Sequence, residues 1–383
     1  MTSGEIVQPG PPRSTALSSA KARHEAPPLA KRIGSVQTRF PAPSDASRYR
    51  WLAVRFIPRA VFFALSAALV MAACSAGPSI APNSPSGGTA PPTGWASAVG
   101  STPIIPILAS SELARGKERF LFILTDQAGH VISDPSATAH VRFFDLARDP
   151  NHPAAETDAP FYWLIEGARG LYRAPVTFTE AGQWGAEFIV ARTGTPAASP
   201  PPSPDPIASP VTVRVIFTVR EHSSTPAIGD PAPPADTPTL ATAGGDPRKI
   251  STDPQPDPRL YQLSIRNALA AKQPFLVIFG TPAFCQTATC GPTLQIVRGV
   301  LADYPNLNAI HVEPYVLAEK DGSLQPVLDA SGNLQPVPAV TAWGLNTEPY
   351  TFLVGADGTV QAKFEGAIDP VELRAAIDAL PNK

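Results

Sequence analysis

Proline most limits what this chain can fold into, because its ring removes a backbone donor and keeps it out of helix interiors and central strands. The 383 residues include 47 prolines, against an average share of about 5%. Nearly half of them lie in stretches without hydrophobic periodicity, at 1–47, 75–104 and 222–258. Such composition is typical of linkers that bury no core. We therefore expect a multidomain protein whose folded parts, 105–221 and 259–383, are joined by Pro-rich linkers and move independently.

The charge of the chain is nearly balanced. Lys and Arg number 30, Asp and Glu number 32, and no basic block follows the N-terminal region. A protein that binds nucleic acid through the phosphates needs a strongly basic surface. The sequence therefore predicts no nucleic-acid partner.

An apolar run from Ala60 to Ala73 follows four arginines and is typical of an export signal. As a helix its 14 residues reach about 21 Å, short of the roughly 30 Å hydrocarbon core, which favours a cleaved signal over a permanent membrane anchor. The run ends in Met71-Ala72-Ala73-Cys74, which resembles the lipobox of bacterial lipoproteins. That resemblance implies a signal peptide at 48–74, a lipid on Cys74, and an extracytoplasmic protein anchored to the cell membrane. Residues 1–47 then form a disordered leader or precede a true translation start near Val54.

Residues 105–221 predict an all-β domain. Period-two alternation runs from Gly170 to Phe178, and turn signals separate further apolar runs at 120–124, 141–144, 161–165, 187–190 and 211–217. This spacing is typical of an immunoglobulin-like β-sandwich. The segment containing Tyr172 and Trp184 resembles small extracytoplasmic β-sandwich modules that accompany bacterial redox and copper proteins. We expect both side chains in the core rather than at a ligand site.

Residues 259–383 change to an α/β pattern. A continuous apolar run at 274–279 predicts a strand buried on both faces. A loop with Cys285 and Cys290 follows, and then Leu294, Val297, Leu301 and Tyr304 recur on one face of a helix. The remaining elements that we expect are a helix at 260–271, a strand at 309–317, a hairpin around 356–358, and a closing helix with Asp369 as its N-cap.

This order of elements resembles the thioredoxin fold, and most closely the membrane-tethered thiol-disulfide oxidoreductases of the bacterial envelope. In that family a segment of the form aromatic-Gly-Val-x-x-x-Pro-Thr-x-Phe-Leu-Ile-x-x-x-Gly carries a cis-proline beside the active cysteines. Residues 343–358 match this form. The resemblance implies that Pro349 is cis, that Cys285 and Cys290 are catalytic, and that Phe284 and Glu348 contact the substrate, which is a thiol or disulfide of a partner protein.

The cysteines lie where chemistry favours them. A helix N-terminus presents unpaired N–H groups, which stabilise a thiolate over a thiol. Two such cysteines exchange with a partner disulfide without a cofactor. Either Cys285 or Cys290 can attack first, and we favour Cys285 as the more exposed thiol with Cys290 as resolving partner. The chain departs from the family in its C-x4-C spacing, in Ile278 where a thioredoxin has a buried acid, and in Glu348, whose charge opposes thiolate formation.

Two alternatives remain open. Cys285 and Cys290 can form a permanent disulfide in a redox-inactive interaction module. The same thiols with His311 can hold copper, as the Sco-type copper chaperones do with two cysteines and a histidine, since soft thiolates select Cu(I). His311 lies on an expected strand, which favours a structural role for it.

Overall fold

The computed structural model describes residues 92–95, 102–193 and 205–381. The expected signal peptide with Cys74, the leader 1–47 and most of the linker 75–104 lie outside these residues. The described residues belong to one compact unit. Within the described ranges, none of the helices has the length and apolar character needed to cross a membrane.

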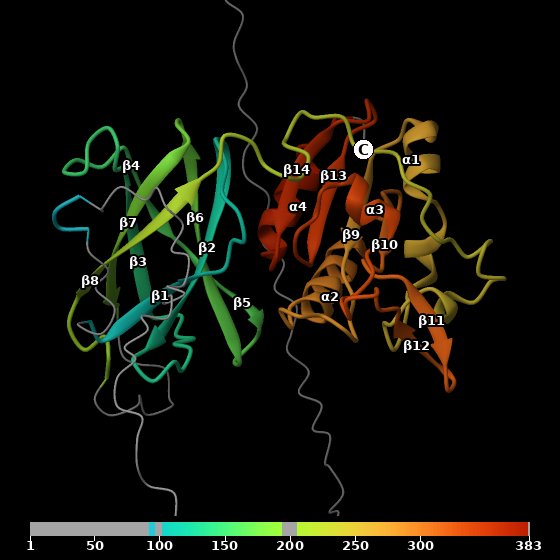
Figure 1. The fold of residues 1–383 in the computed structure, drawn as a ribbon, viewed down its shortest axis with the longest axis horizontal. Helices are drawn as coiled ribbons and strands as arrows, with labels where there is room; N and C mark the ends of the chain where they lie inside the picture. Colours follow the sequence, from blue (N-terminus) through green and yellow to red (C-terminus); the bar gives the residue numbers. More distant parts are fainter. Residues whose placement is uncertain (1–91, 96–101, 194–204, 382–383) are drawn as a thin grey trace, which may run out of the picture. The chain divides into compact units, whose positions relative to one another are not determined.

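The first folded part consists of two four-stranded antiparallel sheets (Figure 1). One sheet has the order β1-β2-β6-β5, with strands Ile104–Leu108, Gly116–Asp126, Arg169–Phe178 and Phe161–Ile165. The other has the order β4-β3-β7-β8, with strands Ala155–Ala159, Ala137–Asp145, Gly182–Arg192 and Val211–Val219. The prediction of a β-rich, multidomain chain is confirmed.

Aromatic side chains fill the core between these two sheets. Phe120 and Phe122 of β2 contact Phe188 of β7, with ring centroids 6.1 and 4.8 Å apart. Tyr172 and Trp184 lie in the same core, each 1% exposed, as the sequence predicts. Their polar atoms are satisfied by backbone carbonyls, which is the usual state of a buried Tyr or Trp.

The second folded part contains a mixed sheet of order β10-β9-β13-β14. Strand β9 pairs parallel with β10 and antiparallel with β13. The strands are Asn308–Val312, Phe275–Phe279, Tyr350–Val354 and Val360–Glu365, and the helices are α1 (Ile265–Ala271), α2 (Cys290–Leu301), α3 (Pro338–Ala342) and α4 (Pro370–Asp378). A separate hairpin joins β11 (Leu317–Lys320) to β12 (Ser323–Pro326), and two short 3₁₀ turns span Pro247–Lys249 and Pro258–Tyr261.

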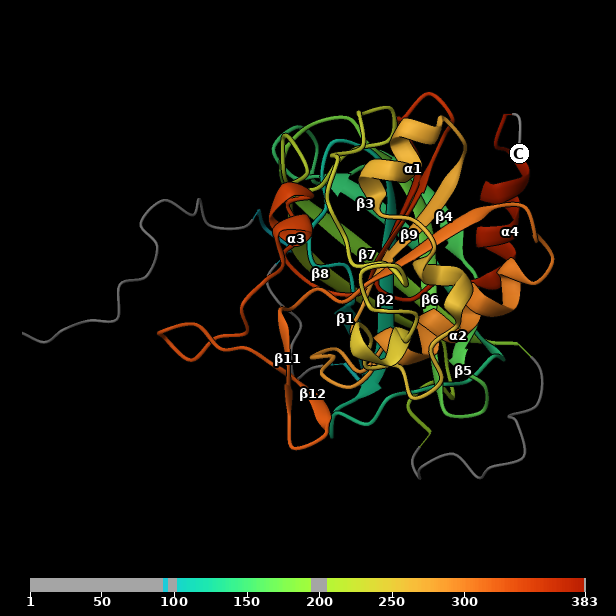
Figure 2. The same cartoon turned by 90° about the vertical axis from the view of Figure 1, so that its right-hand side faces the viewer.

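Helices pack on both faces of this sheet, arranged around it as Figure 2 shows. Leu276 and Ile278 of β9 share a core with buried residues of α2 and α4, whereas Phe275, Val277 and Phe279 share one with α1 and α3. Every side chain of β9 is therefore buried, which is why its sequence shows no alternation.

Local signals set the ends of several elements. Asp369 caps α4 through a 2.9 Å bond to the Val371 N–H, as predicted. The expected helix at 260–271 is shorter, because Ser264 caps α1 and residues 258–261 form a 3₁₀ turn before it. The expected strand at 309–317 is also divided, since β10 ends at Val312 and the chain then turns into β11.

The segment 222–258, expected as a linker, is bonded to the second folded part along much of its length. Gly229 and Ala232 donate backbone hydrogen bonds to Val360 and Gly358, and Leu240 donates one to Tyr261. Ala232 is only 5% exposed and contributes to the core beneath α1 and α3. A proline-rich segment cannot form a central strand, but it can still pack in an extended form against a folded surface.

The first sheet also has an apolar outer face, made by Leu121, Ile123, Leu164 and Leu171 of β2, β5 and β6. These residues cluster with Ala367, which follows β14, and with Ile296 of α2. Arg119 adds hydrogen bonds to Glu372 and to two carbonyls of the second part. These contacts join the two folded parts, which differs from the independent movement that the linker composition led us to expect.

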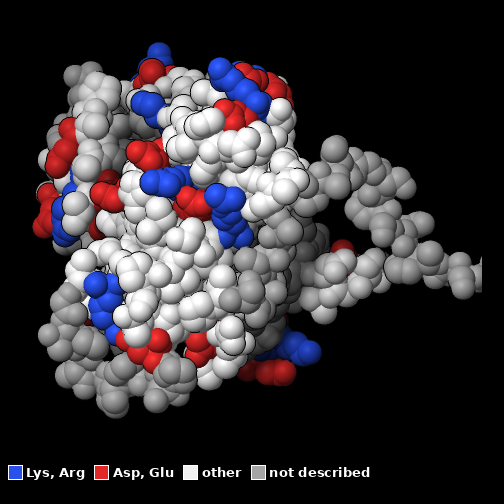
Figure 3. All heavy atoms as spheres, turned by 90° about the vertical axis from the view of Figure 1, so that its left-hand side faces the viewer, with Lys and Arg blue, Asp and Glu red and all other residues white. Residues whose placement is uncertain are grey.

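On the face of the molecule in Figure 3, acidic and basic side chains lie interspersed. No patch of a single sign dominates that face.

Candidate functional site

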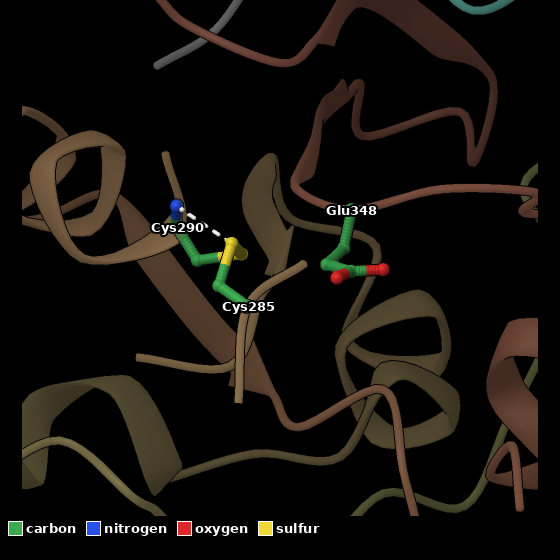
Figure 4. Close-up of side chains that lie close together, drawn as sticks. All are labelled: Cys285, Cys290 and Glu348. Atoms are coloured by element: carbon green, nitrogen blue, oxygen red, sulfur yellow. Dashed lines mark hydrogen bonds between the residues drawn. A yellow bond between two sulfur atoms is a disulfide. The ribbon is translucent and has the colours of Figure 1, made fainter. Parts of the chain in front are cut away.

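The two cysteines of the second folded part lie between the end of β9 and the start of α2. Cys285 and Cys290 form a disulfide with their Cα atoms 5.9 Å apart (Figure 4). Cys290 is the first residue of α2 and is 1% exposed, while Cys285 in the preceding loop is half-buried. Solvent therefore reaches the Cys285 side of the bridge more readily.

The start of α2 directs a hydrogen-bond donor at Cys285. The backbone N–H of Cys290 points to the Cys285 Sγ atom at 3.2 Å, and the Thr287 hydroxyl lies 3.3 Å from the same sulfur. Thr289, the N-cap, makes no side-chain capping bond, so this sulfur takes the place of a cap for one N–H of the first turn. The same contacts would stabilise a negative charge on Cys285 after reduction.

Glu348, just before β13, is hydrogen-bonded to the loop that carries Cys285. Its Oε1 atom accepts the Gln286 N–H at 3.0 Å, and its backbone carbonyl accepts the Thr287 hydroxyl at 3.0 Å. The register explains the proximity: β13 runs antiparallel to β9 with Tyr350 opposite Phe279, so residues just before β13 meet residues just after β9. Figure 4 shows the Glu348 side chain beside the bridge.

Glu348 is 5% exposed, and each oxygen of its carboxylate accepts one hydrogen bond. Its Oε2 atom accepts the Tyr315 hydroxyl at 2.8 Å. Burial, together with the bond to Glu348, raises the pKa of Tyr315 well above its ordinary value, so Tyr315 stays a donor at physiological pH. Tyr315 falls within the expected strand 309–317 and lies between β10 and β11 in the structure, and no local sequence signal marks it as a site residue.

Pro349 lies against the site through Gly280. The Glu348–Pro349 peptide is cis, as predicted. A Cβ atom built on Gly280 would lie 3.5 Å from the Cβ atoms of both Cys290 and Pro349. Gly280, directly after β9, therefore lies close to both the buried cysteine and the cis-proline. Phe284, the other expected substrate contact, is half-buried in the loop before Cys285.

His311 is buried and bonded elsewhere. Its Nδ1 atom lies 2.7 Å from the Tyr261 hydroxyl and its Nε2 atom 2.8 Å from the Gly280 carbonyl. Because a carbonyl oxygen only accepts, the Nε2 atom donates to Gly280, and the Nδ1 atom shares a hydrogen bond with the Tyr261 hydroxyl. Within the described ranges, the one group of three Cys, His, Asp or Glu side chains close enough to hold a metal comprises Cys285, Cys290 and Glu348, with ligand atoms within 4.8 Å of one another. The structure does not bring His311 into that group.

The chain matches no protein-family model, and a comparison with curated proteins finds no similar sequence. The geometry of the site therefore carries the functional argument.

Proposed function

We propose that residues 259–383 form a thioredoxin-like domain that exchanges thiols and disulfides with partner proteins through Cys285 and Cys290. Two features support that fold. The mixed sheet has helices on both faces, and a disulfide joins Cys285, in the loop after the central strand β9, to Cys290, the first residue of α2. The observation that carries the function is the half-buried Cys285 sulfur, which receives the first N–H of α2 and is bridged to a buried Cys290. We also propose that the preceding β-sandwich is immunoglobulin-like.

The exchange proceeds in two displacements. The Cys285 thiolate of the reduced protein attacks one sulfur of a partner disulfide, so that a Cys285–partner bond forms and the partner's own S–S bond breaks. The released partner sulfur leaves as a thiolate and takes a proton from solvent. Cys290 then loses its proton and attacks the Cys285 sulfur, which restores the Cys285–Cys290 bridge and releases the second partner thiolate. Two electrons pass to the partner, and the reverse sequence oxidises a partner dithiol.

Glu348 has a role in the second displacement. The Cys290 thiol is buried and must give up a proton before it attacks. The Glu348 carboxylate, within 4.8 Å of both sulfurs, accepts this proton directly or through one water. Its charge also opposes a lasting thiolate nearby, and so favours the bridged form.

The compartment follows from the N-terminal segment. A signal peptide at 48–74 with a lipid on Cys74 places the domain outside the cytoplasm on the cell membrane, where disulfides persist and partner disulfides are present. The partners that we propose are therefore extracytoplasmic proteins with thiols or disulfides.

Copper delivery has one observation in its favour, the group of Cys285, Cys290 and Glu348. Cu(I) prefers sulfur and imidazole to a carboxylate, and both nitrogens of His311 are already bonded. Thiol exchange is therefore the better supported function. Stoichiometric Cu(I) binding by the reduced protein, weakened in His311→Ala, would instead support delivery.

The deciding experiment uses full-length protein with Cys74→Ser as the background, so that all thiols counted belong to the pair. We expect the reduced protein to reduce insulin disulfides, and both Cys285→Ser and Cys290→Ser to abolish turnover. Cys290→Ser should accumulate a mixed disulfide with insulin through Cys285, whereas Cys285→Ser should not. The reduction potential of the pair should lie above about −300 mV, because structural bridges usually lie below it. A bridge that resists reduction beyond that value would leave only a redox-inactive module.

A further inference from the structure

A cavity of about 490 Å³ adjoins the disulfide loop. Thr287, Thr289 and Glu348 line it from the cysteine site, and Ile107, Leu164 and Leu171 line it from the first sheet. Thr287 contacts the Cys285 sulfur, and its hydroxyl is also hydrogen-bonded to Thr289 and to Glu348. The cavity is therefore continuous with the site.

The apolar wall of the cavity belongs to the outer face of the first sheet. Residues of that face that cluster with Ala367, among them Leu164 and Leu171, also line the cavity, as Ala367 itself does. Ile107 and Val131, which also line the cavity, are each 45% exposed. A concave pocket lined mostly by apolar side chains, with a few polar groups, is the usual form of a binding site.

We propose that this cavity binds a bulky apolar side chain of the protein segment whose cysteine exchanges with Cys285. This inference rests on the proposed function and names its substrate class. A cavity of this size accepts a group as large as a small ligand, with room for a Leu or Phe side chain and part of its neighbour. The exposed loop residues Gln286 and Ala288 leave the approach to Cys285 open to a chain that continues past the cavity.

Charge argues for a protein segment over a small anionic thiol. Glu348 and Glu365 line the cavity together with one cation, Arg169. The lining therefore carries one excess negative charge, and the Glu348 carboxylate lies within 4.8 Å of the cysteine sulfurs. These charges repel a peptide such as glutathione, which carries a net negative charge, but not a neutral apolar side chain. The preferred substrate therefore has bulky apolar residues near its cysteine and no acidic ones.

The test measures exchange by the reduced full-length protein on two disulfide-linked peptides that differ only in having Leu or Ser beside the cysteine, with glutathione disulfide as a third substrate. We expect the Leu peptide to react with about ten-fold or greater kcat/KM than the Ser peptide, because burial of one Leu side chain accounts for such a ratio. Ile107→Asn should reduce this ratio to about three-fold or less. Val131→Asn provides a second, independent change at the same wall.

Ile228→Asn is the matched control, since Ile228 is 57% exposed and does not line the cavity. It should keep both the rate and the ratio of wild type. Equal rates on the two peptides in wild type, or an equal fall in the ratio for Ile107→Asn and Ile228→Asn, would overturn the apolar site while leaving thiol exchange intact. Failure of wild type on all three substrates would overturn the proposed function itself, and the inference with it.

Discussion

Arg119 and Glu372 offer a quantitative test of how the two folded parts are joined. The Arg119 guanidinium donates two 2.8 Å hydrogen bonds to the Glu372 carboxylate, and further bonds of 3.1 and 3.0 Å to the carbonyls of Glu365 and Ala367. Both charged side chains are only 15% exposed. Removal of one partner from a pair this buried leaves an unpaired charge and costs about 3–5 kcal/mol.

The perturbation is a double-mutant cycle with Arg119→Met and Glu372→Gln, which keep the size of each side chain. Glu372 retains a weaker contact with Arg173 at 3.4 Å. The free energy of unfolding should therefore decrease by about 3 kcal/mol in Arg119→Met, which is the lower end of the range. The double variant lacks both charges, so no buried charge is left unpaired. We therefore expect a coupling free energy of about 2 kcal/mol or more.

The assay is urea unfolding followed by tryptophan fluorescence and by far-UV circular dichroism. Arg248→Met is the control, because the Arg248–Asp246 pair is exposed and its loss should not shift the transition. A coupling free energy below about 0.5 kcal/mol would refute the reasoning, since it would mean that the pair contributes no more than a surface ion pair.

Three further changes test other contacts by the same unfolding assay. Asp369→Ala removes the cap of α4 and should cost about 1 kcal/mol, with a loss of helical signal; no loss would contradict the capping role. Gly344→Ala should cost about 2 kcal/mol or more and expose segment 222–258 to protease, because φ is +61° and a Cβ would lie 2.0 Å from the Ser224 carbonyl; wild-type protease resistance would contradict that packing. His311→Phe leaves the Gly280 carbonyl without its donor and should cost about 1–3 kcal/mol; a neutral result would show that the ring is not a structural partner.

Much of the local structure could be predicted because its causes are local. Asp369 and Pro370 mark the start of α4, and the apolar face of Leu294, Val297 and Leu301 defines α2. Helix α2 ends before Tyr304, although that residue still packs against the same core. Capping and periodicity act within a few residues, so the sequence around them suffices.

Other features depend on what packs against a segment. The run Phe120–Leu124 suggests one buried face, yet Leu121 and Ile123 contribute to the outer face that meets Ala367 and Ile296. The proline-rich segment 222–258 has the composition of a linker, yet Ala232 and Ala235 are buried against the second folded part. Composition predicts whether a segment can form helix or strand, but not whether a neighbouring surface accepts it.

The sequence by itself determined the place of the two cysteines, the helix that follows their loop and the proline-led strand, because each depends on residues close together in the chain. Only the tertiary structure decided that Glu348 bonds to Tyr315 and to the cysteine loop, that His311 bonds to Tyr261 instead, and that a wall of the first sheet adjoins the site. The physical reason is that β13 pairs antiparallel with β9, and such pairing joins residues that are more than sixty positions apart, as in the bond between Gln286 and Glu348. Contacts of that kind follow from the packing of whole elements, and no local pattern encodes them.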